Sequence, residues 1–330
     1  MRAWRVHHYG EPREVLRPDE VPVPEPGPGQ VRLRVRAAAV NFPDALLCRG
    51  RYQVRPPLPF TPGVEMCGEV ELLGEGVEAG APLTPGSRVV STAALPGGAF
   101  AEYAVVPAAG VLPAPEALDD AEAAAFHIGY QTGWFALHRR AAVRPGETLL
   151  VHAAAGGVGS AAVQLGKAAG AVVVGVAGGP RKADAVRALG ADVVVDRHAE
   201  DFVAVVKEVT GGRGADVVFD PVGGDAYTGS TKCVAFEGRI VVVGFAGGTV
   251  PAPGLNHALV KNYSVLGLHW GLYAQRDPAA VRAAHAELTR LAAEGTIRPL
   301  VSERLPLAAA PDAVQRLADG ATTGRLTLHP

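Results

Sequence analysis

The sequence predicts an α/β protein in which a β-rich segment precedes a parallel sheet buried on both faces. Up to about residue 122, short segments such as Val31–Arg36 alternate polar and apolar residues and are separated by Gly and Pro. This pattern is typical of a small barrel or sandwich. Beyond residue 122, Val-rich runs alternate with helical patterns, as expected of βαβ units that build a parallel sheet.

The β-rich part ends near Asp119–Glu122, a helix-start signal. Within it, the prolines of Val21–Gly29 exclude a helix because they fix φ and remove backbone donors. The predicted strands share short length and Gly or Pro boundaries: Trp4–His7, Val31–Arg36, Met66–Leu73, Arg88–Thr92 and Ala101–Val106.

Strands and helices alternate in the rest of the chain. The predicted strands are Thr148–His152, Ala171–Val176, Val193–Val195, Asp216–Phe219, Arg239–Gly244 and Ser264–Leu268. The predicted helices are Val158–Ala169, Lys182–Leu189, Asp201–Thr210, Gly224–Cys233 and Pro278–Ala293.

Composition places the chain among globular proteins and excludes several classes of partner. Its 330 residues are 48% hydrophobic and 19% charged. The length fits two domains, and the composition fits a globular protein with a well-buried core. A net charge of -2 provides no basic surface for nucleic acid or anionic lipid. No apolar run approaches the roughly 20 residues of a membrane span, and the first residues resemble no signal peptide. Three dispersed cysteines favour a reducing compartment, so we expect a cytoplasmic protein.

The strand–turn–helix pattern of Leu149–Lys167 predicts a dinucleotide site. A turn with Gly156, Gly157, Val158 and Gly159 would place a pyrophosphate on the N-terminus of the following helix. Ala154 stands where the usual fingerprint has its first glycine, so the motif taken alone is weak evidence.

The end of the next predicted strand indicates which dinucleotide would bind. An NAD site carries Asp or Glu about 20 residues after the glycine turn, but Ala177–Lys182 holds no carboxylate and ends with Arg181 and Lys182. A 2′-phosphate requires such positive charge, so the segment favours NADPH over NADH. The alternative is that Arg181 and Lys182 are solvated charges at a helix start.

Several ordered motifs together resemble the zinc-free quinone oxidoreductase (zeta-crystallin-like) branch of the medium-chain dehydrogenase/reductase superfamily. They are Asn41–Asp44, Gly50–Tyr52, Pro62–Glu65, Ala154–Gly159, Leu189–Asp192, Asp220–Gly224 and Gly238–Gly244. Phe245–Gly248 and Lys261–Gly271 are similar to the quinone oxidoreductase-like subgroup in particular.

The resemblance implies a Rossmann dinucleotide-binding domain inserted in a GroES-like β-rich catalytic domain. We expect the catalytic domain to comprise residues 1–122 and a return segment, 269–330, with the Rossmann domain at 123–268. The resemblance also implies homodimerisation through the last Rossmann strand, about Tyr263–Leu268. That apolar strand is equally consistent with an edge strand covered by its own chain.

The resemblance also argues against zinc. Catalytic zinc in related alcohol dehydrogenases requires a cysteine where Asn41 stands and a histidine where Val64 stands. A structural zinc site requires four clustered cysteines, whereas this chain has three dispersed ones. No metal site is therefore expected.

By family position, Asn41, Asp44 and Tyr52 are the candidate catalytic residues beside the nicotinamide. Tyr52 matches a tyrosine that protonates the substrate in related enoyl reductases, since a phenol can donate to an enolate. In the alternative, Tyr52 only packs in the cleft wall and water supplies the proton. Asn41 is expected to orient a group by hydrogen bonding because an amide does not titrate near neutrality.

The remaining candidate residues are expected to contact the cofactor. By family position Thr132 would contact the nicotinamide side, and the alternative is a simple helix hydroxyl group. Arg197 replaces a family tyrosine near the 2′-phosphate, and its guanidinium can pair with that phosphate or stack on adenine. The other candidates fall on strand-end loops or the returning tail, where packing or solvation is the alternative role; they are Val222, Phe245, Leu268, His269 and Arg325. His269 is also a candidate for the substrate cleft.

These observations predict an NADPH-dependent, zinc-free oxidoreductase that transfers hydride to quinones or other conjugated carbonyls. Catalysis would consist of positioning and of stabilising the developing enolate. An enoyl-thioester reductase (enoyl-CoA or acyl-carrier-protein substrates) or a 2-alkenal reductase is the nearest alternative. A different class is an NADPH-binding structural or regulatory protein with little catalysis.

Overall fold

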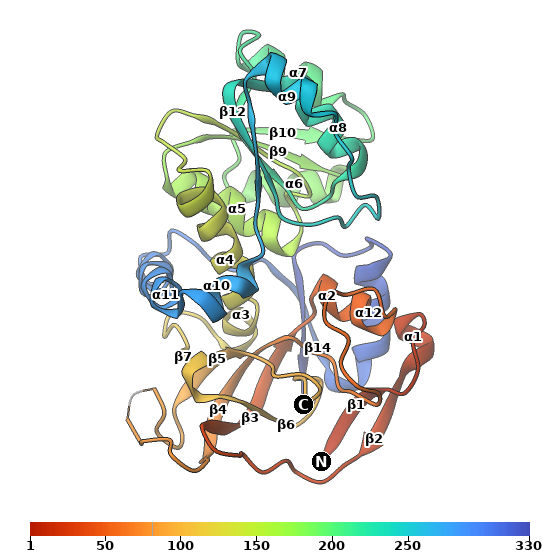
Figure 1. The fold of residues 1–330 in the computed structure, drawn as a ribbon, viewed down its shortest axis with the longest axis vertical. Coiled ribbons are helices and arrows are strands. Elements are labelled where there is room, and N and C mark those ends of the chain that lie inside the picture. The colour runs from red at the N-terminus through yellow and green to blue at the C-terminus, as the bar shows by residue number, and fades with distance from the viewer. Residues whose placement is uncertain (81) are drawn as a thin grey trace. The chain divides into compact units, whose positions relative to one another are not determined.

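The protein was analysed as a computed structural model that describes residues 1–80 and 82–330. The chain divides into two compact units (Figure 1). Unit 1 comprises Met1–Ile128 and Arg298–Pro330, and unit 2 comprises Gly129–Ile297. Each unit has its own sheet system and is described by itself.

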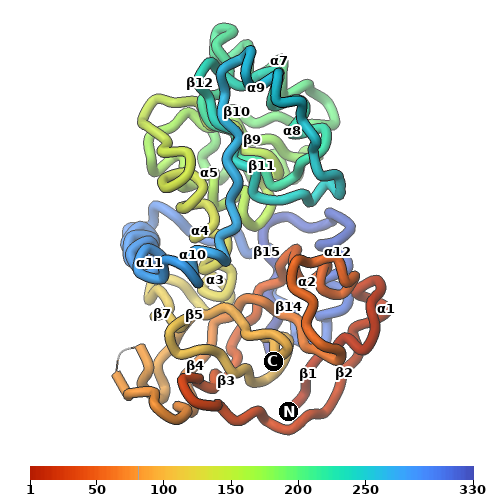
Figure 2. The backbone as a smooth tube through the Cα atoms, in the orientation of Figure 1, coloured from red at the N-terminus to blue at the C-terminus, as the bar shows by residue number. Residues whose placement is uncertain are grey.

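Unit 1 is built on a mixed sheet with strand order β14-β15-β3-β4-β5-β7, to which β6 adds by pairing with β3. A separate antiparallel pair is formed by β1 and β2. Figure 2 shows the last part of the chain, in dark blue, returning beside β3. The strands are β1 (Arg2–Val6), β2 (Leu16–Glu20), β3 (Gln30–Ala39), β4 (Glu65–Leu73), β5 (Arg88–Thr92), β6 (Tyr103–Pro107), β7 (Leu112–Pro113), β14 (Val301–Pro306) and β15 (Arg325–His329).

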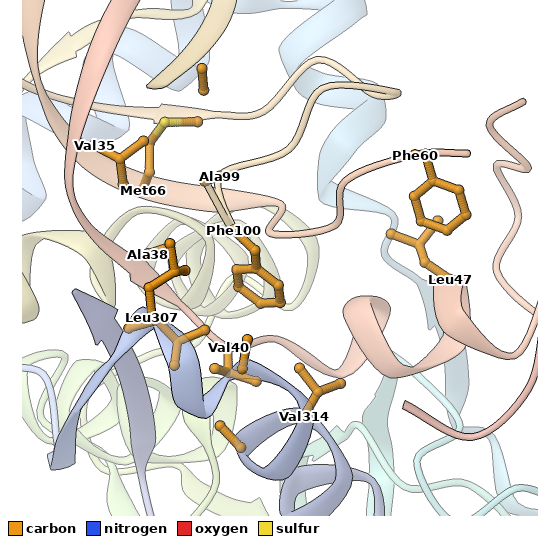
Figure 3. Packing of buried hydrophobic residues seen from close by; sticks show 14 of the residues in the cluster. Val35, Ala38, Val40, Leu47, Phe60, Met66, Ala99, Phe100, Leu307 and Val314 are labelled. Atoms are coloured by element: carbon orange, nitrogen blue, oxygen red, sulfur yellow. The ribbon is translucent and has the colours of Figure 1, made fainter. Parts of the chain in front are cut away.

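The core of unit 1 lies on the apolar face of this sheet. Along β3, Val31, Leu33 and Val35 are buried at every second position, as the predicted alternation requires. Figure 3 shows Phe100 and Leu307 beside Ala38 of β3, and Val314 beside Val40, which follows that strand. A fully buried apolar side chain contributes about 1.5–3 kcal/mol to stability. The helical elements are α1 (Pro12–Val15), α2 (Phe42–Cys48), η1 (Ala108–Gly110), α3 (Asp120–Ala124), η3 (Leu307–Ala309) and α12 (Ala310–Ala318).

Unit 2 contains a six-stranded parallel sheet with order β10-β9-β8-β11-β12-β13. If the strands are numbered within the unit, this order is 3-2-1-4-5-6, which is the doubly wound order. The chain adds strands on one side of β8 and then on the other, so the order of addition reverses between β8 and β11. The carboxyl ends of the strands at this reversal are where such folds bind ligands. The strands are β8 (Thr148–Val151), β9 (Val172–Ala177), β10 (Val193–Asp196), β11 (Ala215–Asp220), β12 (Val234–Val242) and β13 (Ser264–Gly267).

The helices of unit 2 match the predicted alternation, with two predicted ranges, Gly224–Cys233 and Pro278–Ala293, found as α8 and α11. The sequence patterns did not predict α9, α10 or the π-helical turn η2. The helical elements are α4 (His127–Trp134), which begins at the end of unit 1, η2 (Phe135–Arg140), α5 (Gly157–Ala168), α6 (Pro180–Ala188), α7 (Phe202–Val209), α8 (Gly224–Cys233), α9 (Leu255–Lys261), α10 (Trp270–Arg276) and α11 (Pro278–Ala293).

The first unit boundary falls later than the expected residue 122, at Ile128. The predicted helix start is correct, because Asp119 and Glu122 form a capping box at the start of α3. However, α3 packs on β3 and β4. Glu122 also forms a bidentate ion pair with Arg298, with N–O distances of 2.6 and 2.9 Å. These contacts keep the segment in unit 1.

The second boundary lies at Arg298, whereas the sequence predicts the return from residue 269. The difference arises because α10 and α11 pack within unit 2. Gln131 Nε2 on α4 donates to the Val281 carbonyl of α11 over 3.0 Å, and the rings of Phe135 and Tyr273 lie 4.2 Å apart. The return segment is therefore shorter than expected.

No helix within the described ranges has both the length and the apolar character that crossing a membrane requires.

Candidate active site

The predicted glycine turn connects β8 to α5. Gly156 is the N-cap of α5 and offers no side chain to the free backbone N–H groups, so the helix N-terminus can receive an anion. A Cβ atom at Gly159 would lie 2.1 Å from the Ala153 carbonyl oxygen, whereas one at Gly156 would lie 3.1 Å away. Close backbone packing thus makes glycine essential at Gly159 and leaves more room at Gly156.

Ala154 is tolerated because glycine stands opposite it in β9. Its backbone N–H donates to the Val176 carbonyl over 2.9 Å, and its side chain is fully buried. A Cβ atom at Gly175 would lie 3.2 Å from the Ala154 methyl group. In the usual fingerprint a glycine in the turn leaves this space open. Here Gly175 in β9 leaves the space that the Ala154 methyl group fills.

Positive side chains gather around the turn after β9. A Cβ atom at Gly178 would lie 2.9 Å from Arg197 Nε, so the guanidinium lies directly over this glycine. Burial, and to a lesser extent the charge of Arg197, lowers the pKa of Lys182. Arg181 is exposed beside Lys182 in the first turn of α6. The three predicted phosphate-binding cations thus border one turn.

The ends of β11 and β12 bring Val222 and Phe245 together. Asp220 Oδ1 accepts hydrogen bonds from the backbone N–H groups of Val222 and Gly223, at 2.8 and 2.9 Å. A Cβ atom at Gly223 would lie 2.9 Å from the Phe245 ring. Asp220 Oδ2 is buried with no hydrogen-bond partner among the described residues. Asp220 therefore shapes the turn that carries Val222.

The other predicted unit 2 residues lie on separate elements. Thr132 is buried on α4, and α4 packs closely on α5, since a Cβ atom at Gly133 would lie 2.9 Å from Leu165. Leu268 is buried after β13, where its N–H donates to the Val242 carbonyl over 3.0 Å. His269 is exposed at the N-cap of α10. Their contacts with a cofactor stay predictions.

In unit 1, Asn41 belongs to a buried polar network. Its Nδ2 donates to Glu65 Oε2 over 3.0 Å and to the Ala39 carbonyl over 3.1 Å. Its Oδ1 accepts from Arg325 Nη1 over 2.7 Å, and Arg325 Nη2 forms an ion pair with Glu65. The amide orientation of Asn41 is thereby set by two oppositely charged neighbours.

Arg325 is held inside unit 1 by the same network. The residue is only 6% exposed, and Glu65 is fully buried. Burial raises the pKa of Glu65, whereas the charge of Arg325 acts in the opposite direction. Arg325 Nε is buried without a hydrogen-bond partner in residues 1–80 and 82–330. Whether Arg325 also contacts a cofactor stays a prediction.

Asp44 ties the start of α2 to the segment before β4. Its Oδ2 accepts from the Asn41 backbone N–H, and its Oδ1 accepts from those of Gly63 and Val64, at 2.8 to 3.2 Å. Burial raises the pKa of Asp44 to about 7, against the effect of these three donors. All three contacts are to backbone groups, and a catalytic role of Asp44 stays a prediction.

Tyr52 is half-buried against the core of unit 1. Burial and the charge of Asp44 raise the pKa of its hydroxyl group. Tyr52 is therefore a neutral phenol at physiological pH and retains a proton that it can donate.

Sequence reasoning missed Glu65 and Asp220 as site residues, although both lie in segments that it singled out. Glu65 is the first residue of β4 and Asp220 the last of β11. A carboxylate beside an apolar strand must be paired or hydrogen-bonded if it is buried, and this was the available signal. The partner of Glu65 is 260 residues away in the sequence, so the pairing itself could not be read from local pattern.

Among the residues that the structure describes, no group of three or more His, Cys, Asp or Glu side chains is arranged to hold a metal ion.

Two family models match the chain. The one for "Zinc-binding dehydrogenase" matches residues 157–288, and the one for "Alcohol dehydrogenase GroES-like domain" matches residues 27–116. Together with the relatives below, they show that the chain belongs to the medium-chain dehydrogenase/reductase superfamily and is an oxidoreductase of that superfamily. The predicted fold class, a Rossmann domain with a GroES-like domain, is confirmed.

Within this superfamily, the chain is similar to quinone oxidoreductase-like proteins. It is 37% identical to the quinone oxidoreductase-like protein 2 homolog of Nematostella vectensis, over 89% of this chain and 80% of that protein. The Escherichia coli quinone oxidoreductase complexed with NADPH superposes with a TM-score of 0.92 at 32% identity and full coverage of both chains. A mycocerosic acid synthase-like polyketide synthase of Mycobacterium tuberculosis is 33% identical over 88% of this chain and 14% of its own length.

Proposed function

We propose that this protein is an NADPH-dependent, zinc-independent reductase of quinones or other conjugated carbonyls. The observation that carries the proposal is the cationic turn after β9. There Arg197 lies over Gly178, Lys182 stands in the first turn of α6, and Ala177–Lys182 contains no carboxylate. The solved E. coli relative contains NADPH, which supports the same cofactor here. Asn41 and Val64, in place of metal-binding residue types, support zinc independence.

The residues of unit 2 fit NADPH in chemistry. The uncapped N-terminus of α5 suits the pyrophosphate, and the cations around Gly178 suit the 2′-phosphate. An NAD-type carboxylate would repel that phosphate, and Ala177–Lys182 contains none. Val222 and Phe245 supply apolar surface at the neighbouring strand ends.

When bound, NADPH supplies the hydride that reduces the conjugated system. In our proposal, Tyr52 donates a hydrogen bond or a proton to the enolate oxygen of the substrate, because its raised pKa keeps it protonated. Asn41 orients a polar group through an amide that Glu65 and Arg325 hold in place. Asp44 positions the start of α2, where Asn41 is the N-cap residue.

Replacing Lys182 with alanine is expected to lower NADPH affinity about tenfold and to leave NADH affinity unchanged, because the lost interaction is with the 2′-phosphate. The measurement is a fluorescence titration with each cofactor. Arg187→Ala is the matched control, since Arg187 lies at the far end of α6 and pairs with Asp184. An unchanged NADPH preference in Lys182→Ala would remove the phosphate assignment.

Replacing Tyr52 with phenylalanine is expected to lower kcat about tenfold to a hundredfold with an alkenal acceptor, because the proton donor is lost. The dissociation constant of NADPH is expected to stay the same, since Tyr52 is proposed to act on the substrate. Stopped-flow turnover and a separate binding titration check the two parts. An unchanged kcat in Tyr52→Phe would show that water, and not Tyr52, donates the proton to the enolate.

An acceptor screen tests the proposal as a whole. NADPH oxidation is expected with naphthoquinone, phenanthrenequinone or an alkenal, and a zinc chelator is expected to leave the rate unchanged. The relative within a polyketide synthase favours adding an enoyl-thioester to the panel, and turnover of that compound alone would select the enoyl-thioester alternative. Tight NADPH binding without turnover of any conjugated carbonyl would instead favour a binding protein.

We also propose that the protein is a cytoplasmic homodimer that pairs through β13. This strand forms one edge of its sheet, which leaves unpaired backbone groups available to a second copy. Apolar side chains nearby are exposed, with Leu255 at 83%, Leu259 at 77% and Val265 at 45%, as expected of an interface. The three free cysteines are buried, which is consistent with a reducing compartment.

The double variant Leu259→Glu with Val265→Lys is expected to elute as a monomer, because charges would be buried at the interface. Size-exclusion chromatography with light scattering measures the mass. Val54→Glu is the control, since Val54 is 54% exposed in unit 1. A wild-type monomer would contradict the proposal, as would a dimer that survives both charges.

A further inference from the structure

We propose that His198 is a specificity-determining residue that contacts the 2′-phosphate of NADPH and makes the preference for NADPH over NADH depend on pH. This inference rests on the proposed NADPH preference and adds a fourth side chain to the cations considered above. Its basis is the position of the imidazole over the glycine turn after β9.

The backbone holds His198 against this turn. The Arg197 N–H donates to the Ala177 carbonyl over 2.9 Å, which fixes the loop after β10 beside the end of β9. Asp196 Oδ1 accepts from the backbone N–H groups of both Gly179 and His198, at 2.8 and 3.0 Å. One carboxylate oxygen therefore joins the two loops and places His198 next to Gly179.

The imidazole itself reaches the glycines. A Cβ atom at Gly178 would lie 3.3 Å from His198 Nε2 and 3.1 Å from Arg197 Nη2, and one at Gly179 would lie 3.9 Å from His198 Nδ1. Both side chains thus occupy the space over Gly178. An anion that reaches the Arg197 guanidinium there also comes within range of the imidazole.

The charged groups that face the imidazole come from both loops. On its own loop are Asp196, Arg197 and Glu200, whose Oε2 accepts from the Asp196 backbone N–H over 3.2 Å. α6, which begins directly after Gly179, carries Arg181 and Lys182 in its first turn. Asp196 Oδ1 accepts from two backbone donors, which leaves Oδ2 as the remaining acceptor of this carboxylate.

Protonation of His198 would add a positive charge and a second N–H donor to this cluster. Histidine changes charge between about pH 5 and 8, whereas Arg and Lys keep theirs. A bound phosphate favours the protonated imidazole, so His198 strengthens phosphate binding at low pH and contributes little once it is neutral. The preference for NADPH over NADH should therefore weaken as the pH rises.

Calorimetric titration of the full chain with 2′,5′-ADP and with 5′-AMP separates phosphate binding from adenine binding. At about pH 6, His198→Gln is expected to bind 2′,5′-ADP about three- to fivefold more weakly than wild type, the size of an exposed charge pair. At about pH 8 the difference is expected to disappear. The phosphate itself titrates near pH 6, so the ratio between variant and wild type at each pH is the quantity that isolates His198.

Two further variants serve as controls. His198→Lys is expected to bind at least as well as wild type at both pH values, because its charge is permanent. Arg187→Gln, which changes charge at the far end of α6, is expected to match wild type throughout. For wild type and all variants, 5′-AMP affinity is expected to be equal at a given pH.

The outcomes distinguish this inference from the function on which it rests. If wild type binds 2′,5′-ADP no better than 5′-AMP, the NADPH preference itself fails. Suppose that wild type prefers 2′,5′-ADP but that His198→Gln binds 2′,5′-ADP as tightly as wild type, or more weakly by the same factor at both pH values. Either result would overturn only the proposal that the charge of His198 contributes to phosphate binding. An equal loss for 5′-AMP would assign His198 to adenine.

Discussion

Replacing Arg325 with methionine is expected to lower the free energy of unfolding by about 3–5 kcal/mol, because Glu65 would remain as an unpaired buried charge. Glu65 is fully buried, and its pKa is raised by burial and lowered by Arg325. Without Arg325, the folded-state pKa rises further above the unfolded value. Protonated Glu65 is tolerated in the core, so the stability of the variant is highest below the pKa that Glu65 has in the unfolded chain. This stability is lost as the pH rises through the higher pKa of Glu65 in the folded variant. The difference in unfolding free energy between wild type and variant is therefore larger at pH 8 than at pH 5.

Urea unfolding at the two pH values measures this deficit, and hydrogen exchange of β3, β4 and β15 locates it in unit 1. Arg304→Met is the matched control, since the Arg304–Asp119 pair is half-exposed and should contribute less than about 1 kcal/mol. Adding Glu65→Gln to Arg325→Met is expected to recover part of the loss. Equal losses in Arg325→Met and Arg304→Met would contradict the argument.

Replacing Gly159 with alanine is expected to weaken NADPH binding at least about a hundredfold, equal to about 2.7 kcal/mol. The new Cβ atom would lie 2.1 Å from the Ala153 carbonyl oxygen and 2.8 Å from its carbon. Both are backbone atoms of the turn, so the turn must open and the N–H groups at the start of α5 must move away from the pyrophosphate.

Gly156→Ala is the graded comparison, because its Cβ atom would meet only one atom, at 3.1 Å. We expect Gly156→Ala to weaken the affinity for NADPH by less than about tenfold. A fluorescence titration gives both affinities, and circular dichroism verifies that each variant is folded. Similar affinities for the two variants would show that close packing at Gly159 does not shape the site.

Continuous apolar runs predicted the central strands of unit 2, because β8, β9 and β11 are largely buried on both faces. Runs such as Val172–Ala177 can hardly be anything but central strands, and the capping box at Asp119 marks a helix start without tertiary information. The extent of the return segment was not predictable in this way. The pattern of Pro278–Ala293 specifies an amphipathic helix but does not specify which unit covers its apolar face.

The site was predictable to the extent that its chemistry is local. The glycine turn and the cations Arg181 and Lys182 follow directly from sequence. The network of Asn41 with Glu65 and Arg325 joins segments brought together only by the pairing of β15 with β3. Likewise, the position of His198 depends on how two loops are joined by one carboxylate.

The division of the chain into units has a consequence for its synthesis. Unit 2 is one continuous segment, Gly129–Ile297, whereas unit 1 requires both Met1–Ile128 and Arg298–Pro330. Domains usually fold in N-terminal to C-terminal order as they leave the ribosome. The strands of Met1–Ile128 cannot complete their sheet until β14 and β15 have been synthesised. Unit 2 can therefore complete its fold before unit 1 does. Until Arg325 emerges, Glu65 has no partner charge, so unit 1 cannot close before residues 298–330 have been made.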